Sequence, residues 1–306
     1  MGRLAGNWRG LRKDVPLLIV IAIWSVNFSV NRYGVTHGFD PLFFGGLRYL
    51  VAGVFFVALT LRREGSIRPR REDWLVLGVF TILGTLVNQV AFFYAIHLAT
   101  ASTVSLCFGA LPAFVGLIGI AQGLKRPTAR HWLATLVSFG GVALVAVGGS
   151  TELSGDLGGL LLALCAVISF ALITIGLSRL QGTYSPYRLS ALISIAVALP
   201  MLGAGAHGAS SMHWGSIGWL SWGALAYTTI IGFVVSNILW IQALGTSGPN
   251  RSSLWANLQV FGGAAVGVLL LGEALSGLQL AGGIVIGVGV VLSARRLRLP
   301  RGPILE

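Results

Sequence analysis

Charged residues are scarce in this chain of 306 residues, and acidic residues are the scarcest. Asp, Glu, Lys and Arg make up 10% of the sequence, and only nine residues are acidic, whereas charged residues make up about 25% of a soluble domain. Hydrophobic residues reach 55%, and long apolar runs recur along the whole chain. A run of about 20 residues crosses the roughly 30 Å of hydrocarbon in a bilayer. The composition therefore excludes an ordinary soluble domain and predicts an integral membrane protein.

The sequence also lacks the motifs that usually carry enzymatic chemistry. It has no His-Glu-x-x-His, no phosphate-binding G-x-x-x-x-G-K-[ST] and no Cys/His spacing typical of a metal site. The two cysteines, Cys107 and Cys165, lie in apolar runs, where packing is favoured over a disulfide. No Asp or Glu falls in the middle of an apolar run, so a carboxylate proton relay has no evident member. We expect no catalytic residues, no cofactor and no metal.

Apolar length and the turn residues between runs predict ten transmembrane helices. They cover residues 15–33, 41–61, 74–96, 101–121, 130–148, 157–179, 187–204, 217–240, 250–271 and 277–297. With ten spans, 19 of the 21 basic residues fall on the side of the N-terminus, and the exceptions are Arg32 and Arg48. The positive-inside rule then predicts that both termini are cytoplasmic. The net charge of +12 reflects these loops and does not indicate a nucleic-acid partner.

Two stretches of the chain are similar to each other. The stretch that begins at Trp74 aligns without a gap to the one that begins at Trp222, with seven identities that include Gly84 and Gly232. The turn at Pro41 likewise has a counterpart near Pro186. A chance match between two apolar helices is the alternative explanation. We interpret the match as an internal duplication.

This duplication predicts the architecture. The first five helices, in residues 1–150, form one half, and the next five, in residues 151–306, form the other. Because five is an odd number, the second half crosses the membrane in the opposite direction. The predicted fold is an all-α integral membrane protein with ten transmembrane helices in two inverted-topology repeats. Secondary transporters commonly have this arrangement, with the substrate site near the midplane between the halves.

Several short motifs point to a known family. They are W-S-V-N-F at 24–28, Arg32, Pro41, L-R-Y at 47–49, A-L-P at 110–112 and L-G-E-A-L-S-G-L-Q-L-A-G-G at 271–283. In this order and spacing they resemble the EamA-type family of the drug/metabolite transporter superfamily. The resemblance implies a ten-helix carrier in the inner membrane, often an exporter of amino acids or other small polar compounds. The chain departs from the family at one position, because the acidic residue expected after the glycine near the end of the fourth span is Leu124, while the second half keeps Glu273.

Polar and aromatic residues inside the predicted spans are the candidate substrate-binding residues, because intramembrane polar groups usually face a bundle interior or a wet cavity. One mid-span proline joins them, because it frees a backbone carbonyl. The set is Trp24, Asn27, Asn31, Arg48, Asn88, Phe92, Tyr94, Pro112, Tyr227, Asn237, Trp240, Trp255, Asn257 and Gln259. The first three share one helical face at i, i+3 and i+7. Aromatic walls with a few amides suit a small amphipathic organic solute. The alternative is that these groups form hydrogen bonds between helices.

Two charged residues near or within the spans need separate interpretation. A guanidinium at bilayer depth costs about 2.5–3.5 kcal/mol on insertion scales, so Arg48 needs a partner. It can bind a substrate carboxylate bidentately, or it can bond to helix carbonyls or reach the outer surface. Glu273 lies at the predicted outer end of its span, where a contact with a helix end is favoured over proton coupling.

Together these features predict a secondary transporter that exports small metabolites, such as amino acids or related amphipathic compounds. It works by alternating access at a central cavity in the bacterial inner membrane. Its expected partners are a small-molecule substrate and the lipid bilayer, with no nucleic acid, and the chain is expected to be a monomer or homodimer. The alternative is a membrane-embedded enzyme or lipid-modifying protein, which would need an acid, base or metal set within the bundle.

Overall fold

The computed structural model describes residues 2–123, 129–148, 157–180, 182–247, 252, 255–256 and 258–294. Nearly all of these residues are helical, and this part of the chain contains no β-strand. Seven of its helical segments are long and apolar enough to cross a membrane, and three shorter apolar helices accompany them at 132–145, 258–271 and 277–289. The prediction of an all-α membrane protein is therefore confirmed.

The helices follow one another with short connections. Their bounds are α1 (Gly2–Thr36), α2 (Pro41–Glu64), η1 (Arg71–Asp73), α3 (Trp74–Val79), η2 (Phe80–Leu86), α4 (Val87–Leu98), α5 (Ala101–Cys107), η3 (Phe108–Ala110), α6 (Leu111–Ala121), α7 (Ala129–Gly148), α8 (Leu157–Leu180), α9 (Pro186–Ser211), η4 (Trp214–Ser216), α10 (Trp219–Thr229), η5 (Ile230–Val235), α11 (Ser236–Ser247), α13 (Leu258–Leu271) and α14 (Gly277–Ala294). Several helices run past the predicted ends, and α9 continues seven residues beyond the predicted end at 204.

The second helix and its counterpart start in the same way. The Asp40 side chain accepts a hydrogen bond from the N–H of Phe43, and Pro41 is the first residue of α2. At α9 the Ser185 hydroxyl accepts from the N–H of Arg188, again with a proline directly after the cap. A capping side chain satisfies one of the free N–H groups of a helix start, and proline loses nothing there. These two turns therefore fix where α2 and α9 begin.

Two of the spans contain a π-helical stretch. η2 joins α3 to α4, and η5 joins α10 to α11. Short π-helical insertions inside α-helices occur often at functional sites. Each stretch carries one glycine of the internal match: a Cβ on Gly84 would lie 2.8 Å from Cβ of Ile173, and one on Gly232 would lie 2.2 Å from Oδ1 of Asn27. Both glycines thus allow a neighbouring helix to approach closely.

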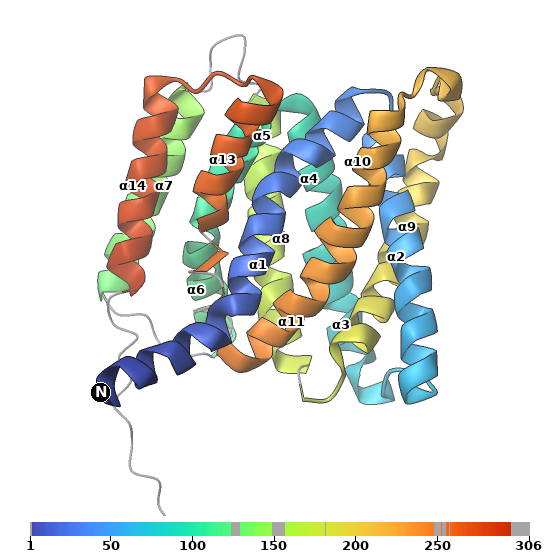
Figure 1. The fold of residues 1–306 in the computed structure, drawn as a ribbon, viewed down its shortest axis with the longest axis horizontal. Helices are drawn as coiled ribbons and strands as arrows, with labels where there is room; N and C mark the ends of the chain where they lie inside the picture. The colour runs from blue at the N-terminus through green and yellow to red at the C-terminus, as the bar shows by residue number, and fades with distance from the viewer. Residues whose placement is uncertain are drawn as a thin grey trace, which may run out of the picture.

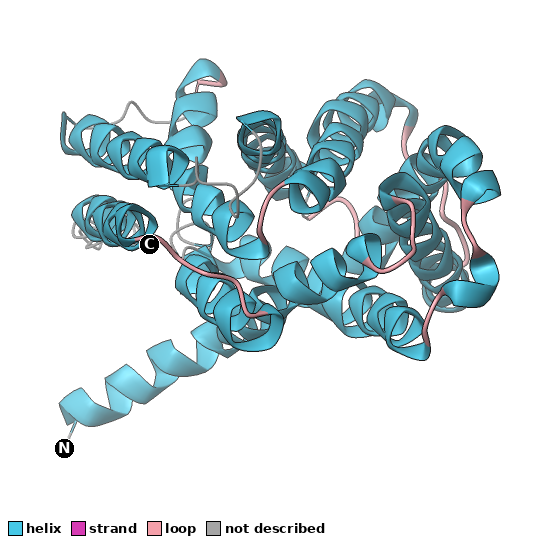
Figure 2. Cartoon of the chain, turned by 90° about the horizontal axis from the view of Figure 1, so that it is seen from above, coloured by secondary structure: helices cyan, strands magenta, loops and turns pink. Residues whose placement is uncertain are grey.

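The helices pack in pairs around a central group. α2 packs along α9, and α7 packs along α14, and these pairs form the two edges of the bundle in Figure 1. In the middle, α4 packs on α8, while α1 contacts α10, α11 and α13. Figure 2 shows most of these helices close to end-on. Long apolar side chains such as Leu75, Trp219 and Leu269 are about four-fifths exposed on the outside, as expected of a surface that faces lipid.

Candidate functional site

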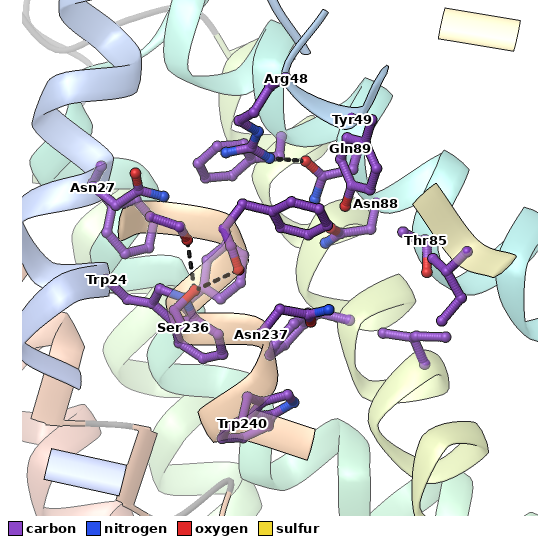
Figure 3. Close-up of a pocket in the computed structure, with 18 of the residues that line it drawn as sticks. Trp24, Asn27, Arg48, Tyr49, Thr85, Asn88, Gln89, Ser236, Asn237 and Trp240 are labelled. Atoms are coloured by element: carbon purple, nitrogen blue, oxygen red, sulfur yellow. Dashed lines mark hydrogen bonds between the residues drawn. The ribbon is translucent and has the colours of Figure 1, made fainter. Parts of the chain in front are cut away.

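A cavity of about 130 Å³ lies among the central helices. It is several times larger than the roughly 10–15 Å³ that one water needs on the same measure, so it has room for a small organic solute. Its walls come from α1, α2, η2, α4, η3, α8, α9, η5, α11 and α13. Figure 3 shows that side chains from these distant parts of the chain converge on one space.

Eight of the predicted site residues line this cavity. They are Trp24, Asn27, Arg48, Asn88, Phe92, Asn237, Trp240 and Gln259. The cavity is also lined by residues outside that predicted set, namely Phe28, Tyr49, Thr85, Gln89, Phe108, Phe170, Ile173, Leu177, Ile193, Gly232, Phe233 and Ser236. Gln89 is next to Asn88 in the sequence, and Gly232 belongs to the internal match, so both had a signal that could have identified them. Apolar residues such as Phe170 had none.

Five other predicted residues lie elsewhere. Asn31 is fully buried beside the cavity, where its Nδ2 donates to the backbone oxygen of Asn27 at 2.7 Å. Tyr94 and Trp255 pack against the apolar core. Pro112 lies at the start of α6, directly after the 3-10 turn η3, and Tyr227 is half-buried on α10. Asn257 lies outside the described residues.

Three aromatic rings form one wall of the cavity. The centroid of the Trp24 ring lies 5.7 Å from that of Phe170 and 5.0 Å from that of Trp240. The rings of Phe170 and Trp240 stack on each other, with their centroids 5.9 Å apart. The indole nitrogen of Trp24 donates to Oγ of Ser236 at 3.0 Å. Tilted and offset ring pairs of this kind stabilise one another beyond their burial. This aromatic wall is therefore a preformed surface for a flat apolar group.

Arg48 lies at the other side of the cavity and begins a chain of hydrogen bonds. Its Nη2 donates to Oε1 of Gln89 at 2.6 Å, and Nε2 of Gln89 donates to Oδ1 of Asn88 at 2.6 Å. Nδ2 of Asn88 then donates to the backbone oxygen of Ala166 at 2.7 Å. These hydrogen bonds link α2, α4 and α8, and they use both the oxygen and the nitrogen of the Asn88 amide.

The rest of the Arg48 environment is neutral. Nη1 makes only a long contact of 3.4 Å with Oδ1 of Asn31. Its guanidinium carbon lies 5.5 Å, 5.1 Å and 5.5 Å from the ring centroids of Tyr49, Phe93 and Phe233. Aromatic faces attract a cation through their quadrupole. They disperse the charge of the guanidinium without neutralising it.

Four polar atoms at the cavity have no hydrogen-bond partner among the described residues. They are Oδ1 of Asn27, Nε of Arg48, Oγ1 of Thr85 and Nε1 of Trp240, out of ten such buried atoms in the described part of the chain. Buried polar groups in proteins are nearly always paired, and an unpaired one costs about 1–3 kcal/mol. The four atoms belong to residues that line one space, but each atom is itself buried, so a partner in the cavity reaches it only if its side chain turns.

Comparison with known proteins identifies the family. A model of the EamA-like transporter family matches residues 13–147 and again residues 157–295. The chain belongs to the EamA-like transporter family. The resemblance expected from the sequence motifs is therefore confirmed, and the long apolar helices are those of a multi-pass membrane protein.

Individual relatives of this EamA-like transporter are similar at low identity over almost their whole length. The transporter YdeK of Bacillus subtilis is 25% identical, with 91% of this chain and 95% of that protein covered. A protein of Salmonella typhimurium described as a probable amino-acid metabolite efflux pump is 27% identical, with 95% and 97% covered. The inner membrane transporter YedA of Escherichia coli K12 is 24% identical, with 94% and 93% covered. A solved crystal structure shares the fold, with a TM-score of 0.64 at 18% identity over 94% of this chain and 99% of the other.

A polar cluster joins two loops of the EamA-like transporter at the end of the bundle where α2 ends and α9 begins. The Tyr184 hydroxyl donates to Oδ2 of Asp73 at 2.5 Å and accepts from the N–H of Arg70 at 2.9 Å. Arg188 Nη1 lies 3.8 Å from Oε2 of Glu64. Burial, with the hydrogen bond to Asp73, raises the pKa of Tyr184 above its ordinary value.

Proposed function

We propose that this EamA-like transporter is a secondary carrier that exports small metabolites, such as amino acids or related amphipathic compounds, by alternating access at the central cavity. The observation that carries the proposal is the cavity itself. It combines the aromatic wall of Trp24, Phe170 and Trp240 with polar atoms that lack internal partners. A solute with an apolar body and a few polar groups fits such a surface. Membership in a transporter family favours a carrier over the membrane-embedded enzyme considered above.

We also propose that the fold is built from ten spans in two inverted halves, residues 1–150 and 151–306. The packing supports this, because α2 and α9, the second helices of the halves, pack together, and so do α7 and α14, the fifth helices. α4, in the third span, packs on α8, the first helix of the second half, while α1 packs on α10 and α11 in the corresponding third span. A pseudo-twofold axis in the membrane plane would exchange these contacts.

Local structure adds support for the inverted halves. The π-helical stretches η2 and η5 occur within the third span of each half. The capped starts of α2 and α9 also correspond. Because basic residues concentrate in the loops on the side of the N-terminus, the positive-inside rule favours cytoplasmic termini. Whether the carrier is a monomer or a homodimer stays a prediction.

In this proposal the outer end of the cavity is closed by an aromatic layer, defined as Phe39, Phe44, Phe93 and Trp222. The Phe39 ring lies 5.3 Å from Phe44 and 5.0 Å from Trp222, and Phe44 lies 5.9 Å from Phe93. The three phenylalanines are buried. Export requires this outer aromatic layer to separate when the halves rock.

Counterflow in proteoliposomes tests the carrier proposal. We expect vesicles loaded with a mixture of unlabelled metabolites to accumulate a labelled member of the mixture in a saturable way. Trp240→Ala should reduce this uptake, because the indole forms part of the aromatic wall. Trp219→Ala is the matched control, since it removes an indole of the same span that is 79% exposed and does not line the cavity. Absence of saturable uptake for amino acids, nucleobases and drug-like cations alike would refute the proposal.

A further inference from the structure

We infer that the solute held in the central cavity is an organic carboxylate that Arg48 binds directly, and that cationic solutes are excluded. The inference rests on the proposed function, because it names the chemical class of the substrate of the same cavity. It is carried by the charge of the cavity, by the donors that Arg48 leaves free and by the position of the aromatic wall.

The charge of the cavity comes from one side chain. Arg48 is the single Asp, Glu, Lys, Arg or His residue among the described residues that line it. Its side chain is 4% exposed, and the ion pairs of the described residues do not include it. A guanidinium stays protonated in proteins, so the cavity carries one uncompensated positive charge. In a poorly screened site such a charge attracts an anion and repels a cation strongly.

The guanidinium of Arg48 has more hydrogen-bond donors than partners. It has five N–H donors, and its partners among the described residues are Asn31, through the long 3.4 Å contact of Nη1, Gln89, through Nη2, and the side chain of Tyr49. Nε has no partner. A carboxylate matches the planar fork of Arg with two parallel hydrogen bonds. Arg48 therefore offers a carboxylate its charge together with the N–H donors that Asn31, Gln89 and Tyr49 do not occupy.

The aromatic wall lies at some distance from Arg48. The Phe233 ring centroid lies 5.5 Å from the Arg48 guanidinium carbon, and Trp240 follows Phe233 by seven residues in the same span. At a rise of 1.5 Å per residue, Trp240 lies roughly 10 Å further along the helix axis. Figure 3 shows Arg48 and Trp240 at opposite ends of the labelled set. A solute with a carboxylate at one end and a flat apolar group at the other spans this distance.

Asn27 extends the same recognition to a neighbouring donor group. Its Oδ1 lacks a partner, and it lies one helical turn from Asn31, which contacts Arg48. One turn corresponds to about 5–6 Å, so a donor close to the carboxylate, such as an ammonium or amide N–H, can reach this oxygen once the Asn27 side chain turns away from Gly232, against which it packs. Zwitterions with a carboxylate therefore belong to the class, whereas cations without a carboxylate do not.

Three probes that share an indole ring and differ in their head group test how the charge of the head group affects binding. Indole-3-acetate carries a carboxylate, indole-3-acetamide a neutral amide, and tryptamine an ammonium. We expect the purified full-length chain to bind the acetate about tenfold to a hundredfold more tightly than the amide, as for a charge-assisted pair, and to show no saturable binding of tryptamine. Isothermal titration at neutral pH measures all three.

Variants then assign the preference to Arg48. In Arg48→Gln the ratio of acetate to amide affinity should fall to about one, and in Arg48→Lys it should be intermediate, because Lys keeps the charge but loses the planar fork. Arg62→Gln, the same change at an exposed position of α2, should keep the wild-type ratio. If Arg48→Gln does not fold, the ratio of acetate to amide affinity in the wild type and in Arg48→Lys still tests the inference.

Several outcomes overturn the inference. Equal wild-type affinity for acetate and amide, tighter binding of tryptamine, or no binding of any probe would each do so. Saturable counterflow of tryptamine without counterflow of the acetate would refute the carboxylate class and leave the carrier proposal intact. An acetate preference that depends on Arg48, in a chain that exchanges no metabolite, would refute the carrier and leave the anion site intact.

Discussion

Arg32 and Glu273 form an ion pair, with Nε of Arg32 at 3.3 Å from Oε1 of Glu273, although they are 241 positions apart in the sequence. The same carboxylate accepts hydrogen bonds from the N–H groups of Ala101 and Ser102 at 2.8 and 2.9 Å. Arg32 also donates to the backbone oxygens of Ile96 and Ala99. The pair thus ties α1 to the end of α4, the start of α5 and the connection before α14. Glu273 makes the contact with a helix end that the sequence favoured.

Removing the Glu273 carboxylate should destabilise the bundle. Its side chain is 7% exposed, and it satisfies free N–H groups at a helix start, where a negative charge is favourable. We expect Glu273→Ala to lower the free energy of unfolding by about 2–4 kcal/mol, because buried donors and a cation lose their partner. Glu273→Gln should cost less, since the amide keeps one acceptor. Thermal unfolding in detergent measures the differences.

A matched control exists on the surface of the same protein. Glu72 pairs with Arg70 at 3.6 Å, but both side chains are more than three-fifths exposed. Exposed pairs contribute about 0–1 kcal/mol, so Glu72→Ala should change the unfolding temperature little. A comparable loss in both variants would show that the burial of Glu273 has no energetic role.

The two glycines of the internal match should respond differently to alanine. A Cβ at Gly84 would lie 3.1 Å from the backbone N and Cα of Ile173. Backbone atoms do not move aside easily, so we expect Gly84→Ala to cost about 1–3 kcal/mol of stability. A Cβ at Gly232 would instead meet the end of the Asn27 side chain, which can rotate. Gly232→Ala should therefore be milder in stability but should weaken solute binding, because it displaces Asn27 at the cavity.

Unfolding temperature and counterflow, measured on both glycine variants, separate the two effects. The expected pattern is a lower unfolding temperature for Gly84→Ala and a raised half-saturation concentration for Gly232→Ala. The reverse pattern would contradict the side-chain arrangement around Asn27.

Sequence reasoning predicted the membrane class, the helical fold and the family. Each depends on signals that many residues share, such as apolar length and motif order. The starts of α2 and α9 were also predictable, because a capping residue followed by Pro41 or Pro186 is a local signal. The π-helical stretches were not, since one extra residue in a turn changes neither hydropathy nor length noticeably.

The candidate site was predictable only in part, for a physical reason. A polar residue in an apolar span indicates burial away from lipid, but the rotation of the helix decides whether it reaches the cavity. Asn27 and Asn31 share a face, yet Asn27 lines the cavity and Asn31 lies behind it against Arg48. Phe170 gives no signal at all, because an apolar side chain in an apolar helix looks the same on every face.

Tyr184 should contribute stability that depends on pH. Its hydroxyl links the loops that follow α2 and α8 through Asp73 and Arg70. We expect Tyr184→Phe to cost about 1–2 kcal/mol at neutral pH, the value of a lost hydrogen bond with one charged partner. Burial raises the pKa of this tyrosine in the folded state, so the fold favours the neutral phenol. The contribution is therefore complete below the ordinary value near 10 and is lost as the pH rises through the folded-state pKa.

Unfolding temperatures of wild type and Tyr184→Phe between pH 7 and about 11 test this sign. The difference should be constant up to about pH 9 and should shrink above about pH 10. Tyr187→Phe is the control, because the Tyr187 ring contacts Arg63 through its face and this contact survives the substitution. A difference that grows with pH would contradict the assignment.

Locking the outer aromatic layer should stop transport. Phe39 lies in the connection between α1 and α2, and Trp222 lies near the start of α10, with their rings 5.0 Å apart. In a background where Cys107 and Cys165 are replaced by Ala, we expect a short bifunctional thiol reagent that joins Phe39→Cys to Trp222→Cys to abolish counterflow. Alternating access requires this end to open, and a covalent link between the connection and α10 prevents it. A monofunctional reagent of similar size on the same variant should leave most of the counterflow, which separates the link from the bulk of the label. Full counterflow in a completely cross-linked chain would mean that the solute leaves by another route, and the outer aromatic layer would then be a fixed part of the scaffold.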